Sequence, residues 1–117
     1  MGKYKLVVLS DAVEGREEEF NDWYSNQHLG DIVDIPGFAS AQRLKLKSVQ
    51  IGHFKNKYLA IYEMDTDDPD KAIEIMLRRR DTGEMFITDA FDWDNASCGV
   101  FEVCSETVFA PNTKPRK

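Results

Sequence analysis

Residues 57–64 of the chain read Lys-Tyr-Leu-Ala-Ile-Tyr-Glu-Met. The stretch is rich in aromatic and apolar residues and predicts a β-strand. Side chains alternate between the two faces of a strand. Apolar residues therefore fall on both faces, with Tyr58, Ala60, Tyr62 and Met64 on one and Leu59 and Ile61 on the other. A strand that is apolar on both sides indicates a sheet that is covered on both sides.

A helix is predicted shortly after this strand. Asp68 supplies an N-cap oxygen, and Pro69 suits the first helical position. We expect this helix to run to about Arg80, because a cluster of arginines is favourable at a helix C-terminus. Upstream of the quoted strand, residues 38–47 predict another strand, and residues 48–56 predict the hairpin connection between the two.

The remaining elements complete a recognisable order. Residues 4–10 predict a first strand and residues 16–28 a first helix, which Gly30 is expected to end. Residues 98–108 predict a last strand. The order β-α-β-β-α-β is that of a ferredoxin-like sandwich, so the fold class is α+β.

The chain length predicts a single domain, and the apolar pattern of its strands predicts a homodimer. A length of 117 residues fits a single domain, which we place at residues 1–110, followed by a disordered tail at residues 111–117. Two helices can cover only one face of a four-stranded sheet, yet the strands are apolar on both faces. The sequence therefore predicts a homodimer in which two sheets pack face to face, as in a dimeric α/β-barrel.

The charge balance excludes several classes of partner. The chain has 15 Lys and Arg against 21 Asp and Glu, a net charge of −6, which disfavours nucleic acid and an anionic membrane surface. The apolar run Leu6–Leu9 is too short for a signal-peptide core or a membrane span, so a cytoplasmic protein is expected. Cys98 and Cys104 lie too far apart along one strand for a disulfide. With His28 and His53 they make no metal signature, and we expect neither metal nor cofactor.

The first predicted helix carries the candidate catalytic residues. One face of this helix is formed by five residues at helical spacing, namely Phe20, Trp23, Tyr24, Gln27 and His28. We call this face the stripe. His28 ends this stripe, and its ordinary pKa near neutrality suits acid–base catalysis. The alternative is a core-edge histidine bonded to a backbone carbonyl. Tyr24 lies one turn earlier, where its hydroxyl either stabilises an oxyanion or belongs to an ordinary core residue.

Candidate substrate-binding residues come from several elements. Arg43 binds a carboxylate or an enolate if it faces inward, whereas burial statistics favour a solvated charge at the sheet edge. The segment 84–97 is unusually apolar for a loop, and it either caps a ligand pocket or packs against the dimer mate. Asp31 either orients the His28 imidazole or lies in a solvated turn. The predicted substrate-binding set is Phe20, Trp23, Arg43, Tyr62, Phe86 and Trp93.

The first helix and the strand after it resemble a known family. The stretch from Gly15 to Leu46 is similar to the EthD-like branch of the dimeric α/β-barrel superfamily. The residues that carry the resemblance are Phe20-Asn21-Asp22-Trp23-Tyr24, His28-Leu29, Ile35-Pro36-Gly37-Phe38 and Ala41 to Leu44. The resemblance implies a ferredoxin-like protomer that dimerises through its sheet. It also implies a pocket histidine, matched by His28, that acts as acid and base without a cofactor.

Three functions stay open at this point. The leading hypothesis is a cofactor-independent lyase, isomerase or cyclase that acts on a small aromatic or polyketide-like molecule, with His28 moving the proton and Tyr24 stabilising an oxyanion. The second is a non-catalytic small-molecule-binding or accessory protein of aromatic-compound metabolism. The third is a haem-degrading or quinol-type monooxygenase of the same superfamily. For this third function Asn21, Trp23 and His28 supply the residue types, although Asn21 is expected to point away from the stripe.

Overall fold

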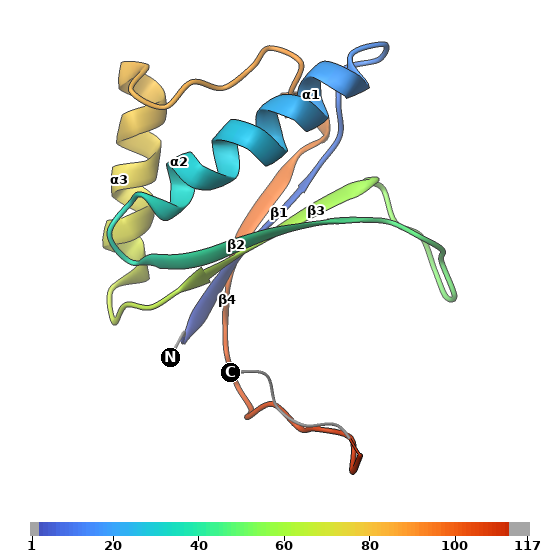
Figure 1. Cartoon of the computed structure of the whole chain (residues 1–117), viewed down its shortest axis with the longest axis vertical. Helices are drawn as coiled ribbons and strands as arrows, with labels where there is room; N and C mark the ends of the chain where they lie inside the picture. Colours follow the sequence, from blue (N-terminus) through green and yellow to red (C-terminus); the bar gives the residue numbers. More distant parts are fainter. Residues whose placement is uncertain (1–2, 113–117) are drawn as a thin grey trace.

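The computed structural model describes residues 3–112 and contains a four-stranded antiparallel sheet with the strand order β2-β3-β1-β4. Its helices lie against one face of that sheet (Figure 1). In chain order the elements are β1 (Tyr4–Ser10), α1 (Glu17–Trp23), the π-helical turn η1 (Tyr24–His28), α2 (Leu29–Val33), β2 (Phe38–Lys45), β3 (Tyr58–Met64), α3 (Pro69–Thr82), the 3-10 turn η2 (Trp93–Asn95) and β4 (Ser97–Glu102). The architecture confirms the predicted α+β, ferredoxin-like fold.

The first helical segment is longer than predicted. Gly30 does not end it, because Gly30 is not among the glycines with a positive φ angle and lies within α2. The continuation is held by apolar burial, since Ile32 and Ile35 are each 1% exposed. The helical segment therefore runs from Glu17 to Val33, with η1 in its middle.

The last strand is shorter than predicted. β4 ends at Glu102, which pairs with Tyr4, the first residue of β1. Because β1 begins at Tyr4, it has no strand residues that could pair with residues beyond Glu102. The prediction that the last strand extends to residue 108 is therefore wrong. Residues 103–112 are exposed and extend away from the sheet (Figure 1). Most of the predicted disordered tail, residues 113–117, lies outside the described residues.

The helix α3 begins and ends as its sequence predicts, with a small shift of its end. The Asp68 carboxylate accepts a hydrogen bond from the Lys71 N–H at 3.1 Å, which confirms the N-cap. The helix continues to Thr82, two residues past the expected end, and stops at Gly83. Gly83 has a φ of 83°, a left-handed conformation that favours glycine as a helix C-cap.

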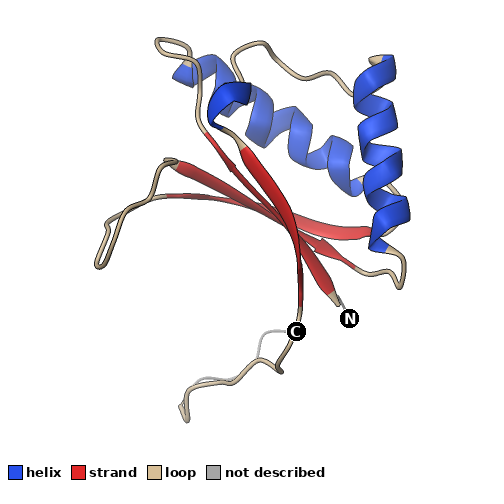
Figure 2. Cartoon of the chain, turned by 180° about the vertical axis from the view of Figure 1, so that it is seen from behind, coloured by secondary structure: helices blue, strands red, loops and turns tan. Residues whose placement is uncertain are grey.

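The sheet is apolar on both faces, but the described elements cover only one. Tyr58, Ala60, Tyr62 and Met64 share one face of β3, as the alternation predicted, and this face is buried beneath the helices. Both views of the cartoon show the opposite face without a helix (Figures 1 and 2). That outer face carries partly exposed side chains at its centre and exposed ones on its edge strands, namely Val7, Leu9, Leu59 and Ile61, then Leu44 and Phe101.

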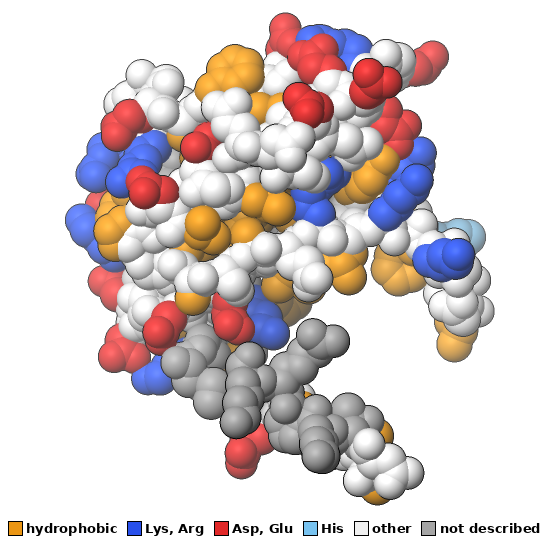
Figure 3. Space-filling model, viewed as in Figure 1, with side chains coloured by type: hydrophobic (Ala, Val, Ile, Leu, Met, Phe, Trp, Pro, Cys, Tyr) orange, Lys and Arg blue, Asp and Glu red, His pale blue; other side chains and the backbone are white. Residues whose placement is uncertain are grey.

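The connection between β2 and β3 projects from the body of the molecule. Figure 3 shows hydrophobic side chains exposed on this projecting hairpin, where Ile51 is 89% and Phe54 60% exposed. His53 lies in the same connection and is exposed, as predicted. Among residues 3–112, no helix is both long and apolar enough to cross a membrane.

Candidate functional site

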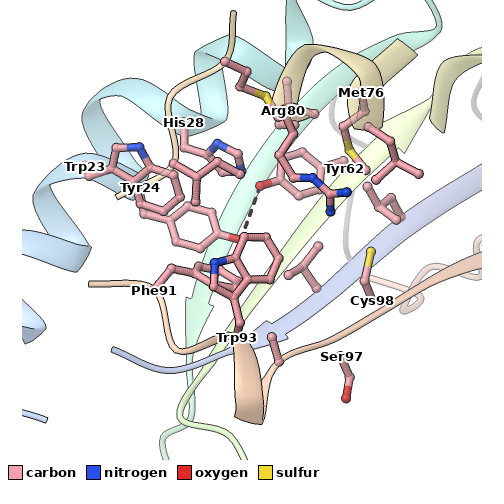
Figure 4. Close-up of a pocket in the computed structure, with 17 residues that line it drawn as sticks. Trp23, Tyr24, His28, Tyr62, Met76, Arg80, Phe91, Trp93, Ser97 and Cys98 are labelled. Carbon is pink, nitrogen blue, oxygen red and sulfur yellow. Dashed lines mark hydrogen bonds between the residues drawn. The ribbon is translucent and has the colours of Figure 1, made fainter. Parts of the chain in front are cut away.

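A cavity of about 220 Å³ lies between the helices and the inner face of the sheet (Figure 4). Its walls come from the helical segment 17–33, from α3, from the three strands β1, β3 and β4, and from the segment between α3 and β4. The lining residues are Leu6, Val8, Trp23, Tyr24, His28, Ile32, Tyr62, Met76, Leu77, Arg80, Met85, Ile87, Phe91, Trp93, Ala96, Ser97 and Cys98.

The π-helical turn η1 brings His28 into this cavity. The N–H of Leu29 bonds the carbonyl of Tyr24, five residues earlier, so the turn holds one residue more than an α-helical turn. In an α-helix, residues five apart point about 140° away from each other. Here the Trp23 and His28 rings stack, with their centroids 4.4 Å apart and an angle of 23° between planes. The wider turn also leaves Gln27 exposed, so its predicted place on the buried stripe is wrong.

His28 is buried without a polar partner. Its side chain is 7% exposed, and within the described part of the chain nothing hydrogen-bonds Nδ1. Of the two alternatives for Asp31, the orienting role is not seen, because Asp31 makes no hydrogen bond to His28 and lies in the first turn of α2. Burial lowers the pKa of His28 from 6.5 to about 4, which makes the imidazole neutral at pH 7. A neutral imidazole carries a lone pair that can accept a proton or a hydrogen bond.

Tyr24 and Tyr62 supply the hydroxyl groups of the cavity. Each is 1% exposed, and the Tyr62 hydroxyl donates to the Tyr24 hydroxyl at 3.4 Å (Figure 4). Burial is the main cause that raises the pKa of both phenols, so both carry their protons at neutral pH. The Tyr24 ring also meets the His28 ring edge-on, at 5.1 Å between centroids.

Arg43 lies on the other side of the Tyr24 ring, outside the cavity. Its guanidinium carbon is 4.5 Å from the centre of that ring, and its Nη atoms donate to Ser25 and Asn21, both at 2.8 Å. The prediction of a solvated edge charge is therefore wrong: the side chain faces the helices and is half-buried. Burial lowers the pKa of Arg43. Phe20 is fully buried against Tyr24 and does not line the cavity either.

The segment between α3 and β4 forms the outer wall of the cavity. It is fixed by a β-bridge between Ala12 and Phe91 and by a hydrogen bond from Trp23 Nε1 to the Phe86 carbonyl at 3.0 Å. Of its two predicted roles, the structure shows the cap on a pocket: Met85 and Phe91 are buried and line the cavity, and Trp93 lines it while half-exposed. The Phe86 side chain, 57% exposed, does not line it.

The structure thus gathers five of the eight predicted site residues around one cavity: Trp23, Tyr24, His28, Tyr62 and Trp93. Sequence reasoning missed Arg80, which was interpreted only as a favourable charge at a helix end. The signal for Arg80 was its spacing, since it follows Met76 by four residues and therefore lies on the same helical face. Cys98 was also missed as a lining residue; its thiol is free, as is that of Cys104. Within residues 3–112 no group of three or more His, Cys, Asp or Glu side chains could hold a metal ion.

Comparison with known proteins places the fold. No family model matches the sequence, and no curated protein is similar to it in sequence. The haem degrader MhuD from Mycobacterium tuberculosis, whose structure has two haems bound in its active site, is similar with a TM-score of 0.63 and 14% identity, over 90% of this chain and 99% of that one. A proposed monooxygenase from Shewanella loihica PV-4 is similar with a TM-score of 0.53 and 16% identity, over 91% of this chain and 99% of that one.

An EthD family protein from Bacillus halodurans C-125 is also among the similar structures, with a TM-score of 0.47 and 17% identity over 86% of this chain and 98% of that one. The first two of these structures share the ferredoxin-like fold of this chain over about nine tenths of its length. At these sequence identities the similarity establishes the fold alone. The fold does not determine the function, which depends on the residues that line the cavity.

Proposed function

We propose that this chain, with its ferredoxin-like fold, binds a small flat aromatic or enol-type molecule in the cavity and that His28 moves a proton on it without a cofactor. One observation carries the proposal. Buried polar groups in proteins are almost always paired, and the imidazole of His28 lines the cavity with its Nδ1 unpaired within the described residues. A ligand in the cavity that donates a proton or a hydrogen bond to this ring gives the imidazole a polar partner.

The surrounding groups suit proton transfer next to a carbonyl. The neutral imidazole takes a proton from the carbon next to the carbonyl. The electron pair of that C–H bond forms a carbon–carbon double bond, and the π pair of the C=O bond moves to the oxygen, which gives an enolate. The Tyr24 hydroxyl accepts a hydrogen bond from Tyr62, and this keeps the Tyr24 proton available for the enolate oxygen. In an isomerisation, the imidazolium returns the proton to another carbon of the same molecule. In a cyclisation, the enolate carbon attacks a second carbonyl carbon of the same molecule, and the imidazolium gives the proton to the alkoxide that forms.

The dimensions of the cavity favour a ligand of one or two rings. Its volume of about 220 Å³ is below the range typical of drug-sized ligand pockets, roughly 300–1,000 Å³. Haem is larger than such a ligand. The trio considered for a haem or quinol-type site is not brought together, because Asn21 bonds Tyr58 and Arg43 outside the cavity. The residues present therefore do not fit haem, and we derive no step through it.

A second candidate function rests on the pKa of His28. With a pKa of about 4 in the ligand-free cavity, the imidazole is a weak base. This favours binding without turnover, in which His28 only accepts a hydrogen bond from a ligand hydroxyl. The two candidates share the cavity and differ in whether a proton leaves carbon.

Proton exchange in heavy water tests the proposal. The probe is 2-tetralone, a two-ring ketone whose acidic C–H signals fade from the NMR spectrum as deuterium enters. We expect His28→Gln to bind the probe but to exchange it about 10²- to 10⁴-fold more slowly, because a general base is lost. His53→Gln is the matched control, since it makes the same change at an exposed histidine. Equal exchange by the wild type and His28→Gln, with both folded, removes the catalytic proposal and leaves binding.

We also propose that the outer face of the sheet pairs with a second copy of the chain. The support is the uncovered apolar face described above, on which Phe101 is 62% exposed. Analytical ultracentrifugation is expected to give twice the chain mass of 13.4 kDa. Phe101→Asp is expected to shift the equilibrium to monomer, whereas Phe86→Asp, which is similarly exposed elsewhere, leaves it unchanged. A wild-type monomer at micromolar concentration contradicts this proposal.

A further inference from the structure

We infer that Arg80 makes the cavity selective for a ligand that bears one acidic group, so that the substrate class is a one- or two-ring aromatic carboxylate. This inference rests on the proposed function for the identity of the site. Its starting point is the charge of the cavity wall. Among the seventeen lining residues, Arg80 is the one side chain that is ionised at neutral pH, since His28 is neutral and no Asp or Glu lines the cavity.

The Arg80 side chain runs from the last turn of α3 toward the cavity (Figure 4). Its guanidinium lies over the Trp93 ring, at 5.8 Å from the ring centre. Nε donates to Asp81 at 3.0 Å, and Nη2 lies 3.0 Å from the same carboxylate oxygen. Among residues 3–112, Nη1 has no hydrogen-bond partner. Asp81 therefore contacts the Nε–Nη2 edge of the guanidinium, and Trp93 lies against its face. The Nη1 edge stays available to a ligand.

The other arginines of the same cluster are used differently. Arg79 bonds Asp34 at 3.1 Å, lies 4.0 Å from Glu84 and does not line the cavity. Arg78 is exposed and does not line the cavity. In a chain with a net charge of −6, an anion reaches an apolar cavity only where a local cation compensates the repulsion. Arg80 provides that cation and can bind a carboxylate through two parallel N–H groups.

The position of Arg80 also gives the ligand an orientation. Arg80 comes from α3 and His28 from η1, so the cavity is lined by a cation and a neutral base from different helices. A ligand held at Arg80 by its acidic group leaves the rest of its ring system among Trp93, Phe91 and Trp23. Arg80 is thus a specificity-determining residue, and His28 is the residue that acts on the reacting proton.

A matched pair of probes tests this inference by isothermal titration calorimetry. 2-Naphthoate is anionic, and 2-naphthamide has nearly the same shape without the charge. We expect the wild type to bind 2-naphthoate about tenfold or more tightly than 2-naphthamide, because hydrogen bonds to a charged group contribute more than neutral ones. This preference is expected to weaken at high salt, since Arg80 is partly exposed.

Arg80→Gln is expected to abolish the preference and to leave the affinity for 2-naphthamide within about twofold, while Arg78→Gln, the control on the same helix, leaves both unchanged. A preference that survives in Arg80→Gln, or a wild type that binds the two probes equally or binds neither, overturns the inference. His28→Gln separates the two proposals. It is expected to keep the preference for 2-naphthoate even if 2-tetralone exchange shows that His28 is not a base.

Discussion

The two sides of the Tyr24 ring differ in how their polar groups are satisfied. On the outer side, Arg43 bonds Asn21 and Ser25, Asn21 bonds Tyr58, and Tyr58 bonds Glu17; we call Glu17, Asn21, Ser25, Arg43 and Tyr58 the Arg43 cluster. On the cavity side, His28 Nδ1 has no partner within the described residues, and the hydrogen bond between the Tyr62 and Tyr24 hydroxyls is long, at 3.4 Å.

The difference separates a cluster that joins elements of the fold from a candidate binding site. In the Arg43 cluster only Nε of Arg43 is buried without a partner. The other polar groups of the cluster form hydrogen bonds that connect the first helical segment to β2 and β3. The cavity side keeps free polar atoms at a cost in stability, because an unpaired buried group loses its hydration without replacement. Polar groups left open beside a cavity are the ones available to a ligand.

The largest expected effect is on the pH dependence of stability. The pKa of His28 is 6.5 in its ordinary state and about 4 in the folded chain, so between these values the unfolded chain binds more protons than the folded one. Stability is unaffected above pH 6.5 and falls by roughly 3 kcal/mol as the pH drops from 6.5 to 4. Urea unfolding at several pH values measures this loss.

His28→Leu is the reference for that experiment, because subtraction cancels the carboxylates that also titrate in acid. The difference between wild type and variant is expected to grow toward low pH and to become independent of pH above pH 7. A constant difference across this range contradicts a buried, neutral His28.

A pair of leucine substitutions gives the next largest effect, with opposite signs on the two sides of Tyr24. Arg43→Leu is expected to destabilise the chain by about 2 kcal/mol, because it removes two hydrogen bonds and the contact with the Tyr24 ring. His28→Leu at pH 7 is expected to be neutral or stabilising, because an apolar side chain replaces an unpaired polar one. Thermal unfolding measures both, and a large loss of stability in His28→Leu would mean that its imidazole is structural.

The smallest expected effect compares two tyrosine hydroxyls. Tyr58→Phe removes hydrogen bonds to Glu17 and Asn21 and is expected to lower the melting temperature by a few degrees. Tyr24→Phe removes a long hydrogen bond and is expected to lower it less, while it slows 2-tetralone exchange. Equal melting temperatures with unchanged exchange would remove the distinction between the two sides of the ring.

The parts of the fold that follow local rules could be predicted from the sequence. The alternation of Tyr58 to Met64 predicted which residues share one face of β3, and Asp68 marked the start of α3. Both depend on neighbours within one element. The end of the last strand could not be predicted in this way, because it depends on where β1 begins, about a hundred residues earlier in the chain.

The candidate site was predictable in part for a related reason. His28 and Tyr24 stood out by residue type on an apolar stripe, and both line the cavity. The exposure of Gln27 was missed, because apolar spacing does not reveal an extra residue in one turn. The directions of Arg43 and Arg80 were also missed, because each depends on strand register or on a segment distant in sequence that packs against it.

The π-helical turn has a consequence for how such a pocket can originate. An α-helical turn becomes a π-helical one when a single amino acid is inserted, which corresponds to one added codon. That single event rotates every following side chain relative to those before it, and here it places an imidazole face-to-face with an indole. One added residue is therefore enough to turn the imidazole of a helix that covers a sheet toward the cavity, without any change in the strands beneath it.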